Sequence, residues 1–597
     1  MPKKTILKQI LIWRAKYISK KQFIMILSII IGFTAGMGAV VLKNLTHLIQ
    51  YLLDTKLVKY YHHAFYFLFP ILGLTLVYFS VKYIIRHKVS HGIPSTLYAI
   101  SKRKGIMKPF QMFGSILTAP LTVGFGGSVG LEGPTVATGA ALGSNIARMF
   151  HMNQTIRTLL VGCAAAGAMS SIFKAPIAAI VFAIEVFSLD LTIASMLPLL
   201  LASLSAILTS QFFFGDELLL PFRIEDKFYL ADAPFYILLG IIAAFVSLYF
   251  TEVYDRIQKL FDTLNSPIKK LLVGGIGIGL LVYLIPPLYG EGFAVINNLI
   301  VGHPEKALES NIFNLDLANV WHVILLLLAL MFFKIVASAL TFGAGGVGGI
   351  FAPTLFMGSI MGFCMSKVIN HTGLFSTHLS ESNFTLVGMA GLLAGVLHAP
   401  LTAIFLIAEL TGGYDLFVPL MLTSTISFSI TKYFKPHSVY NMELGRKGEL
   451  ITHDKVHAVL TLMDIDKVIE TNFTVLNPEM TLEDIIQKAV KKSKRNIYPV
   501  IDKDSHKLEG IILLDDLRSI MFDQSLYTKL LASDLMQKPL KVINLDTDKM
   551  TDIMKKFQDS SAWNLPVRKD GKYYGFITKS KLLTSYRRQL INLQGES

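Results

Sequence analysis

The sequence predicts an all-α polytopic membrane domain followed by a soluble α/β tail. Of the 597 residues, 52% are hydrophobic and only 16% are charged, whereas soluble proteins carry about 25% charged residues. Long stretches contain no Asp, Glu, Lys or Arg: residues 22–42, 109–131, 191–215, 233–251, 271–290, 335–366 and 383–408. A helix needs about 20 apolar residues to cross a hydrocarbon core, so many membrane passes are expected.

Composition changes sharply near residue 441, where charged residues become frequent and strand-like and helix-like patterns alternate. A soluble tail of ordinary composition therefore follows the membrane part. The predicted division is a basic amino terminus at 1–21, a membrane domain at 22–440, a linker at 441–460, and two similar lobes at 461–527 and 528–597.

The net charge of +15 does not indicate a nucleic-acid partner, because much of it is placed beside the membrane. Residues 1–21 carry seven basic side chains and no acidic one, directly before the first apolar stretch. The positive-inside rule then predicts a cytoplasmic amino terminus, and we expect the tail on the same side of a plasma membrane. Cys163 and Cys364 lie in apolar stretches, so neither a disulfide framework nor redox chemistry is indicated.

The membrane domain contains a weak internal repeat. Residues 166–185 align with 390–409 at an offset of 224, and residues 126–135 align with 345–354 at an offset of 219. The blocks occur in the same order in each half, which indicates duplication. Duplicated halves of transporters commonly have inverted topology, with the substrate site at their interface near the bilayer midplane.

Three glycine-rich segments are the strongest candidates for a binding site: residues 90–94 (SHGIP), 130–134 (GLEGP) and 349–353 (GIFAP). Irregular backbone at membrane depth is tolerated only where protein covers it or where it lines a cavity. In each segment a Pro follows Gly and precedes helix-like sequence, as at the first turn of a helix. Free N–H groups at such ends favour an anion. One segment alone would be explained better by small-residue helix packing, but three segments together with the duplication favour an anion site.

Glu132 lies inside the second of these segments. A carboxylate within a membrane is costly and is a functional candidate by default. When ionised, it could occupy the anion site as a tethered anion, and when protonated it could leave, which would make a proton-sensitive gate. Glu185 and Glu409 hold matching positions in the repeat, which favours a structural role such as capping backbone N–H groups.

The three segments resemble signatures of the CLC family of chloride channels and chloride/proton exchangers. SHGIP resembles the family's G-S-G-I-P, GLEGP its G-x-E-G-P, and GIFAP its G-x-F-x-P signature. The resemblance implies an inverted repeat with broken helices and a homodimer with one pore per subunit. It implies that Glu132 is the gating glutamate. It also implies that the backbone N–H groups of Ile350 and Phe351, and the hydroxyl of Tyr440, bind the central anion.

The first segment departs from its signature, because His91 stands where the family has an anion-coordinating serine. Imidazole has an ordinary pKa of about 6.5, so His91 would give a pH-sensitive anion affinity if its ring faced the anion. If the ring points away, only the backbone of this loop, at Gly92 and Ile93, contributes. Both alternatives stay open.

Two further departures concern charge. Val186 stands where many exchangers of the family carry the intracellular proton glutamate, and an apolar side chain cannot relay protons. This favours passive conduction, as in the family's channels. Leu131 stands where the family often has a basic residue, which predicts weaker electrostatic focusing of anions at the pore mouth.

The tail resembles a pair of CBS domains, since residues 498–517 echo residues 565–582. Such pairs bind adenine nucleotides through a Thr/Ser-x-x-Asp segment that contacts ribose. Neither copy here is complete, and Asp516 and Thr578 are the candidate nucleotide-binding residues. A dimerisation module without a ligand is an equal alternative.

The sequence therefore predicts chloride transport that is channel-like or weakly proton-coupled, with a stoichiometric chloride/proton antiporter as the first alternative. A fluoride-selective transporter and a nucleotide-sensing regulatory membrane protein are further alternatives. Divalent cation transport is disfavoured because such ions need clustered carboxylates. No enzyme, metal site or required cofactor is indicated. The expected partners are chloride, protons, membrane lipid, a second copy of the chain and, at the tail, an adenine nucleotide.

Overall fold

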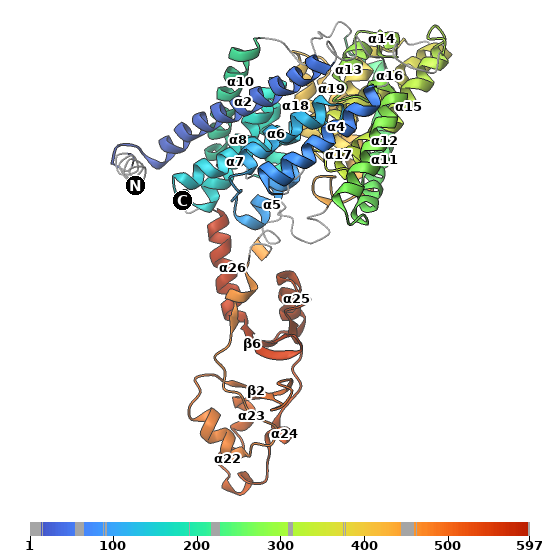
Figure 1. Cartoon of the computed structure of the whole chain (residues 1–597). Helices are drawn as coiled ribbons and strands as arrows, with labels where there is room; N and C mark the ends of the chain where they lie inside the picture. Colours follow the sequence, from blue (N-terminus) through green and yellow to red (C-terminus); the bar gives the residue numbers. More distant parts are fainter. Residues whose placement is uncertain are drawn as a thin grey trace. The chain divides into compact units, whose positions relative to one another are not determined.

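The structure is a computed structural model that divides into two compact units, Met1–Leu450 and Ile451–Ser597 (Figure 1). It describes residues 14, 16–53, 65–87, 89, 92–189, 192–215, 227–308, 315–373, 375, 378–442, 459–460 and 463–594. Most of the basic amino terminus, most of the predicted linker, and His91 lie outside these residues. Among the described residues, eight helices are long and apolar enough to cross a membrane, so the predicted polytopic helical domain is confirmed.

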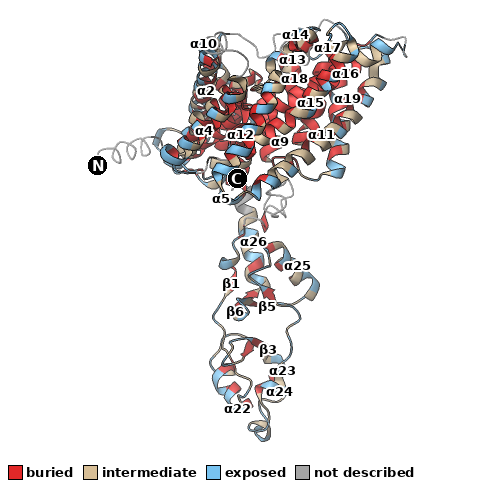
Figure 2. Cartoon of the chain, turned by 45° about the vertical axis from the view of Figure 1, so that its right-hand side comes forward, coloured by how far each residue is buried: buried red, intermediate tan, exposed pale blue. Residues whose placement is uncertain are grey.

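The first half of the membrane unit consists of helices α2 (Lys20–Leu53), α4 (Phe65–Phe79), α5 (Ile93–Arg103), α6 (Gln111–Gly124), α7 (Glu132–Met149), α8 (Gln154–Phe173), α9 (Pro176–Phe187) and α10 (Ile193–Phe214). The second half consists of α11 (Ala233–Asp262), α12 (Pro267–Leu284), α13 (Phe293–Ile300), α14 (Pro304–Leu308), α15 (Val320–Gly343), α16 (Phe351–Thr372), α17 (Glu381–Leu397), α18 (Pro400–Leu410) and α19 (Phe417–Phe434). Buried residues gather inside this bundle (Figure 2).

Several uncharged stretches are two broken helices rather than one span. Residues 335–366 contain the end of α15, a glycine loop and most of α16. The breaks that end α8 and α17 match, because Lys174 and His398 both adopt left-handed backbone, with φ of 53° and 56°. A proline then begins α9 and α18. The two halves of the repeat therefore break their helices in the same way.

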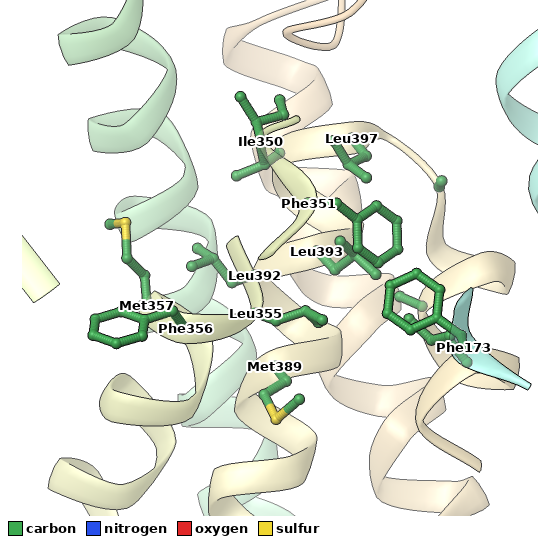
Figure 3. Packing of buried hydrophobic residues seen from close by; sticks show 14 of the residues in the cluster. Phe173, Ile350, Phe351, Leu355, Phe356, Met357, Met389, Leu392, Leu393 and Leu397 are labelled. Carbon is green, nitrogen blue, oxygen red and sulfur yellow. The ribbon is translucent and has the colours of Figure 1, made fainter. Parts of the chain in front are cut away.

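The start of α16 is held in the apolar core. Figure 3 shows Phe351 beside Phe173, with 5.2 Å between their ring centroids. Farther along, α16 packs on α17 so closely that a Cβ on Gly358 would lie 2.6 Å from the carbonyl oxygen of Gly388. Such small-residue contacts are the usual way that membrane helices approach each other closely. The amino end of α16 is therefore fixed in position.

The tail unit has the predicted α/β composition, with two hairpins. Its strands are β1 (Ile469–Glu470), β2 (Ile497–Ile501), β3 (Leu508–Leu513), β4 (Ile543–Asn544), β5 (Asn564–Lys569) and β6 (Lys572–Thr578). Its helices are α22 (Leu482–Ile485), α23 (Leu514–Leu517), α24 (Ala532–Leu535), α25 (Met550–Ser560) and α26 (Lys579–Gln594). The register of the antiparallel pair β2–β3 shifts after Val500, and that of β5–β6 shifts after Val567. The hairpins are therefore copies of one unit.

The chain crosses between the two lobes of the tail. The sheet order β1-β6-β5-β4 places β1, which lies near the start of the first predicted lobe, beside β6 of the second lobe. Val459 and Val468 are buried in the same core as Ile543 and Ile577. Residues that start the first predicted lobe thus pack in the second. The boundaries at 461–527 and 528–597 stay a prediction.

Candidate functional site

The three glycine segments meet in the membrane unit. Gly130 and Gly349 exchange two backbone hydrogen bonds, of 2.9 and 2.8 Å, in an antiparallel bridge. A Cβ on Gly349 would lie 2.8 Å from the backbone nitrogen of Gly133, and one on Gly92 would lie 2.6 Å from the carbonyl carbon of Gly133. These contacts leave no room for side chains. Residues 92–94, 130–134 and 349–353 of these segments therefore form one junction.

Three helices begin at this junction. They are α5 after Gly92, α7 after Leu131 and α16 after Ile350, and none of these capping residues makes a side-chain hydrogen bond to its helix. The first N–H groups of a helix have no partner within it. They carry a partial positive charge that attracts an anion. The arrangement can therefore hold an anion by backbone alone.

The second and third segments have the same backbone geometry, related by the offset of 219 residues. Gly126 and Gly345 adopt φ of 92° and 96°, a conformation that favours glycine. The N–H of Val347 donates to Thr122 Oγ1 at 3.0 Å, and the N–H of Ser128 donates to Thr341 Oγ1 at 3.3 Å. Each half thus supports the other through an equivalent pair, as an inverted repeat requires.

Glu132 begins α7 at the centre of the junction and is 1% exposed. Its carboxylate folds back so that a Cβ on Gly130 would collide with it, and the methyl group of Ala352 would lie 2.9 Å from that Cβ. The carboxylate approaches two backbone N–H groups, that of Glu132 itself and that of Ala352 in the first turn of α16. It forms no hydrogen bond of normal geometry with any described residue.

The other predicted anion ligands lie around the same junction. Ile350 and Phe351 supply the first backbone of α16, and both side chains are buried. Tyr440 is 6% exposed; its hydroxyl has no hydrogen-bond partner among the described residues and interacts electrostatically with Glu132. Ile93 is fully buried at the start of α5. The orientation of the His91 ring lies outside the described residues, so its role in anion binding stays a prediction.

The sequence analysis missed two charged residues that interact with each other, Glu291 and Lys334. The N–H of Leu131 donates to Glu291 Oε1 at 2.9 Å. Lys334, fully buried in α15, donates to the carbonyl oxygen of Gly290 at 2.9 Å and lies 4.7 Å from the ring centroid of Phe356. The sequence did contain a signal for these residues, because Glu291 directly follows one long uncharged stretch and Lys334 directly precedes another.

Glu185 and Glu409 cap helices of the opposite half. Glu185 accepts hydrogen bonds from the N–H groups of Leu401 and Thr402, at 3.0 and 2.8 Å, at the start of α18. Glu409 accepts from the N–H groups of Ile177 and Ala178, at 3.0 and 2.8 Å, at the start of α9. The predicted structural role of these two carboxylates is confirmed.

The remaining candidate residues lie on other elements of the two units. Val186 is buried near the end of α9. In the tail, Asp516 accepts a hydrogen bond from Gln537 Nε2 at 2.6 Å, and Thr578 Oγ1 accepts one from the N–H of Lys581 at 3.2 Å. A pocket of about 280 Å³ lies elsewhere in the tail and is lined by Val475, Asn477, Ile501, Asp502, Lys503, His506 and Tyr573. Among the described residues, no cluster of His, Cys, Asp or Glu could hold a metal ion.

Comparison with known proteins agrees with this arrangement. The family model for voltage gated chloride channels matches residues 72–432, and the CBS domain model matches residues 455–523 and 532–588. The chain is 29% identical over 382 residues to a putative chloride channel protein ClcB-like of Ralstonia nicotianae, covering 63% of this chain and 83% of that protein. It is 28% identical over 449 residues to the H(+)/Cl(-) exchange transporter ClcA of Salmonella paratyphi B, covering 71% and 88%.

Solved structures share the fold. A slow cyanobacterial Cl−/H+ antiporter superposes with a TM-score of 0.59 at 21% identity, covering 71% of this chain and 97% of the other. A eukaryotic CLC transporter gives a TM-score of 0.59 at 16% identity, covering 94% and 97%. Since the channel-family model alone spans more than half of the sequence, the chain belongs to the CLC family, as a multi-pass membrane protein of anion transport with two CBS domains at its carboxyl end.

Proposed function

We propose that the chain carries chloride across the membrane through the glycine junction, and that Glu132 opens and closes this path. The observation that carries the proposal is the position of the Glu132 carboxylate, which is buried beside the first turn of α16 without a hydrogen-bond partner of normal geometry among the described residues. A carboxylate at a helix amino end stands where an anion is favoured. It therefore competes with chloride for the same place.

Protonation decides this competition. An ionised carboxylate is attracted to the partial positive charge of the helix ends and occupies the site. A protonated carboxyl group loses that attraction, so the side chain can leave and chloride can enter. Chloride flux is then expected to rise as the pH falls. Ile350, Phe351 and Tyr440 are proposed to bind the chloride that enters, together with the backbone of Gly92 and Ile93.

Two observations bear on proton coupling, and they differ. Val186 offers no group for proton relay from the inner side, which favours channel-like or weakly coupled conduction. The relatives named H(+)/Cl(-) exchange transporters favour stoichiometric exchange. We propose channel-like or weakly coupled conduction, with exchange as the alternative.

The test uses purified protein in liposomes, with the membrane potential clamped by a potassium ionophore and with chloride efflux and external pH recorded together. Wild-type flux should increase toward acid pH, and Glu132→Gln should give flux that no longer depends on pH and moves no protons. Glu381→Gln, on an ion pair with Lys367 away from the junction, is the matched control. Persistent pH dependence in Glu132→Gln would contradict the gating role.

The same recordings settle coupling. Chloride efflux without proton movement against a gradient would support channel-like conduction. Proton uptake driven by the chloride gradient would establish exchange, and a group other than residue 186 would then have to deliver protons to Glu132.

We further propose that the chain acts as a homodimer in the plasma membrane with the tail in the cytoplasm. An adenine nucleotide bound by the tail near Asp516 and Thr578 is the proposed ligand, and a ligand-free dimerisation module is the alternative. Titration of the full chain with ATP by calorimetry, compared with Asp516→Ala, separates them. Heat of binding that Asp516→Ala abolishes would support the nucleotide site, and absence of heat would support the module.

A further inference from the structure

We propose that Glu291 is a positioning residue that cancels the charge of Lys334, which is held on the loop that contacts the turn of Glu132, and that it thereby sets the pH at which Glu132 opens the anion path. The inference rests on the proposed role of Glu132 as the gate. It goes beyond that role because it concerns two residues outside the glycine segments.

Glu291 is joined directly to the turn that carries the gate. Its Oε1 accepts the N–H of Leu131, the capping residue of α7, at 2.9 Å. Glu132 follows Leu131 in the chain, and the carboxylates of Glu132 and Glu291 interact electrostatically. The bond occupies an N–H group at the amino end of α7. Glu291 therefore fixes both the backbone and the charge next to the gate.

Lys334 is held against the same loop. Its Nζ donates to the carbonyl oxygen of Gly290 at 2.9 Å and lies 3.5 Å from the point that a Cβ on Gly292 would occupy. Gly290 and Gly292 adopt φ of 62° and 91°, so the loop bends on both sides of Glu291. This bend brings the Glu291 carboxylate and the Lys334 ammonium group into electrostatic interaction.

Burial makes this interaction necessary. Lys334 is 0% exposed, and a buried charge is strongly unfavourable unless an opposite charge compensates it. An uncompensated ammonium group near the gate would favour the ionised form of Glu132. Glu132 would then stay in the anion path down to a lower pH. The negative charge of Glu291 removes this effect.

Other titratable and charged groups face the gate. Lys43 of α2 interacts with Glu291, and Tyr440 interacts with both Glu132 and Tyr254 of α11. His91 adjoins Gly92 in the first segment. The measurements are therefore made in wild type and repeated in a His91→Asn background.

The decisive variant is Glu291→Gln, because its amide oxygen can still accept the N–H of Leu131 while the charge is removed. In the liposome assay, the pH of half-maximal chloride flux should fall by about one pH unit, as expected for a change of one nearby charge. Glu291→Asp keeps the charge and should stay closer to the wild-type midpoint. The double variant Glu291→Gln/Lys334→Met removes both charges and should return the midpoint at least halfway to wild type.

Controls separate this inference from a structural effect and from the gate itself. Glu381→Gln removes one charge from the distant pair with Lys367 and should leave the midpoint unchanged. In a Glu132→Gln background, Glu291→Gln should produce no shift. An unchanged or higher midpoint in Glu291→Gln would overturn the inference, as would a double variant no closer to wild type than the single one. Persistent pH dependence in Glu132→Gln alone would instead reject the proposed gate.

Discussion

The segments 126–135 and 345–354 have similar backbone conformations but carry side chains of different chemistry. Both turn at a glycine of positive φ, both exchange hydrogen bonds through Gly130 and Gly349, and both lead into a helix at the next turn. At the first helical residue, however, one has Glu132 and the other has Phe351. Duplication thus provides a symmetric set of backbone donors. The side chains then make one helix end able to titrate and leave the other end fixed.

The surroundings of the two positions enforce this difference. The Phe351 ring packs on Phe173 and Phe182, with centroid distances of 5.2 and 6.5 Å. The carboxylate of Glu132 has no such partner and lies next to the backbone of Gly130. Aromatic contacts of this kind stabilise one arrangement of a side chain. We therefore expect movement at α7 and little at α16 during the opening of the path.

The largest effect is expected where the two segments touch. In Gly349→Ala the new Cβ would lie 2.8 Å from the backbone nitrogen of Gly133, and backbone cannot yield as a side chain can. The junction would separate and chloride flux in liposomes should fall by more than tenfold, on the scale of about 1.4 kcal/mol or more. Flux measurement with equal amounts of reconstituted protein checks this.

Gly275→Ala is the matched control for that substitution. Its Cβ, on α12, would meet Ile71 of α4 at 3.5 Å, an ordinary van der Waals contact. Flux should stay near wild type. Equal losses in both variants would show that the contact between Gly133 and Gly349 is not what holds the junction.

The helix caps give the next largest effect and a small asymmetry. Glu185 accepts a third hydrogen bond, from Thr402 Oγ1 at 2.6 Å, whereas the matching contact of Glu409 is to Ala178, which has no hydroxyl. Hydrogen bonds to charged groups contribute about 1.5–3 kcal/mol each. Glu185→Gln and Glu409→Gln should therefore both lower the midpoint of thermal unfolding in detergent, and Glu185→Gln should lower it more.

Removal of the hydroxyl tests the cause of that asymmetry. In a Thr402→Ala background, the two Gln substitutions should become similar in effect. A larger loss from Glu409→Gln in either background would contradict the assignment of the difference to Thr402.

Much of the site was predictable because it depends on local sequence. The glycine segments and the repeat offsets of 219 and 224 are visible in the chain itself, and they determined the broken helices and their convergence. Glu291 and Lys334 were not predictable in the same way, because the loop bend at Gly290 and Gly292 brings together residues 43 positions apart. In the sequence, both residues stand out only as the charged residues that limit long uncharged stretches. Their partners exist only in the folded structure.

The tail shows the same limit. Its two hairpins repeat in sequence and in register, so their likeness was predictable from residues 498–517 and 565–582. The pairing of β1 with β6 joins segments about a hundred residues apart along the chain, and a strand of two residues carries no periodic signal. Non-local pairing of short strands therefore escaped the sequence analysis.

The smallest effects are expected from the two threonines that join the halves. Thr122→Val removes the acceptor for the N–H of Val347, and Thr341→Val removes the acceptor for the N–H of Ser128. Each leaves a buried N–H group without its partner, which costs about 1–3 kcal/mol. The thermal unfolding midpoint should fall in both, and more in Thr122→Val, whose bond is shorter at 3.0 Å than the 3.3 Å bond of Thr341.

Comparison of these two variants tests whether the two hydrogen bonds that join the halves contribute equally. If the halves support each other equally, both substitutions should also reduce chloride flux by similar factors, because each removes one of two equivalent hydrogen bonds between the halves. A loss of flux confined to Thr341→Val, which acts on the segment that carries Glu132, would show that the two bonds are symmetric in geometry but not in function. The start of α7, which carries Glu132, would then depend on the hydrogen bond that holds its backbone. The start of α16, which Phe351 and its aromatic neighbours fix, would not.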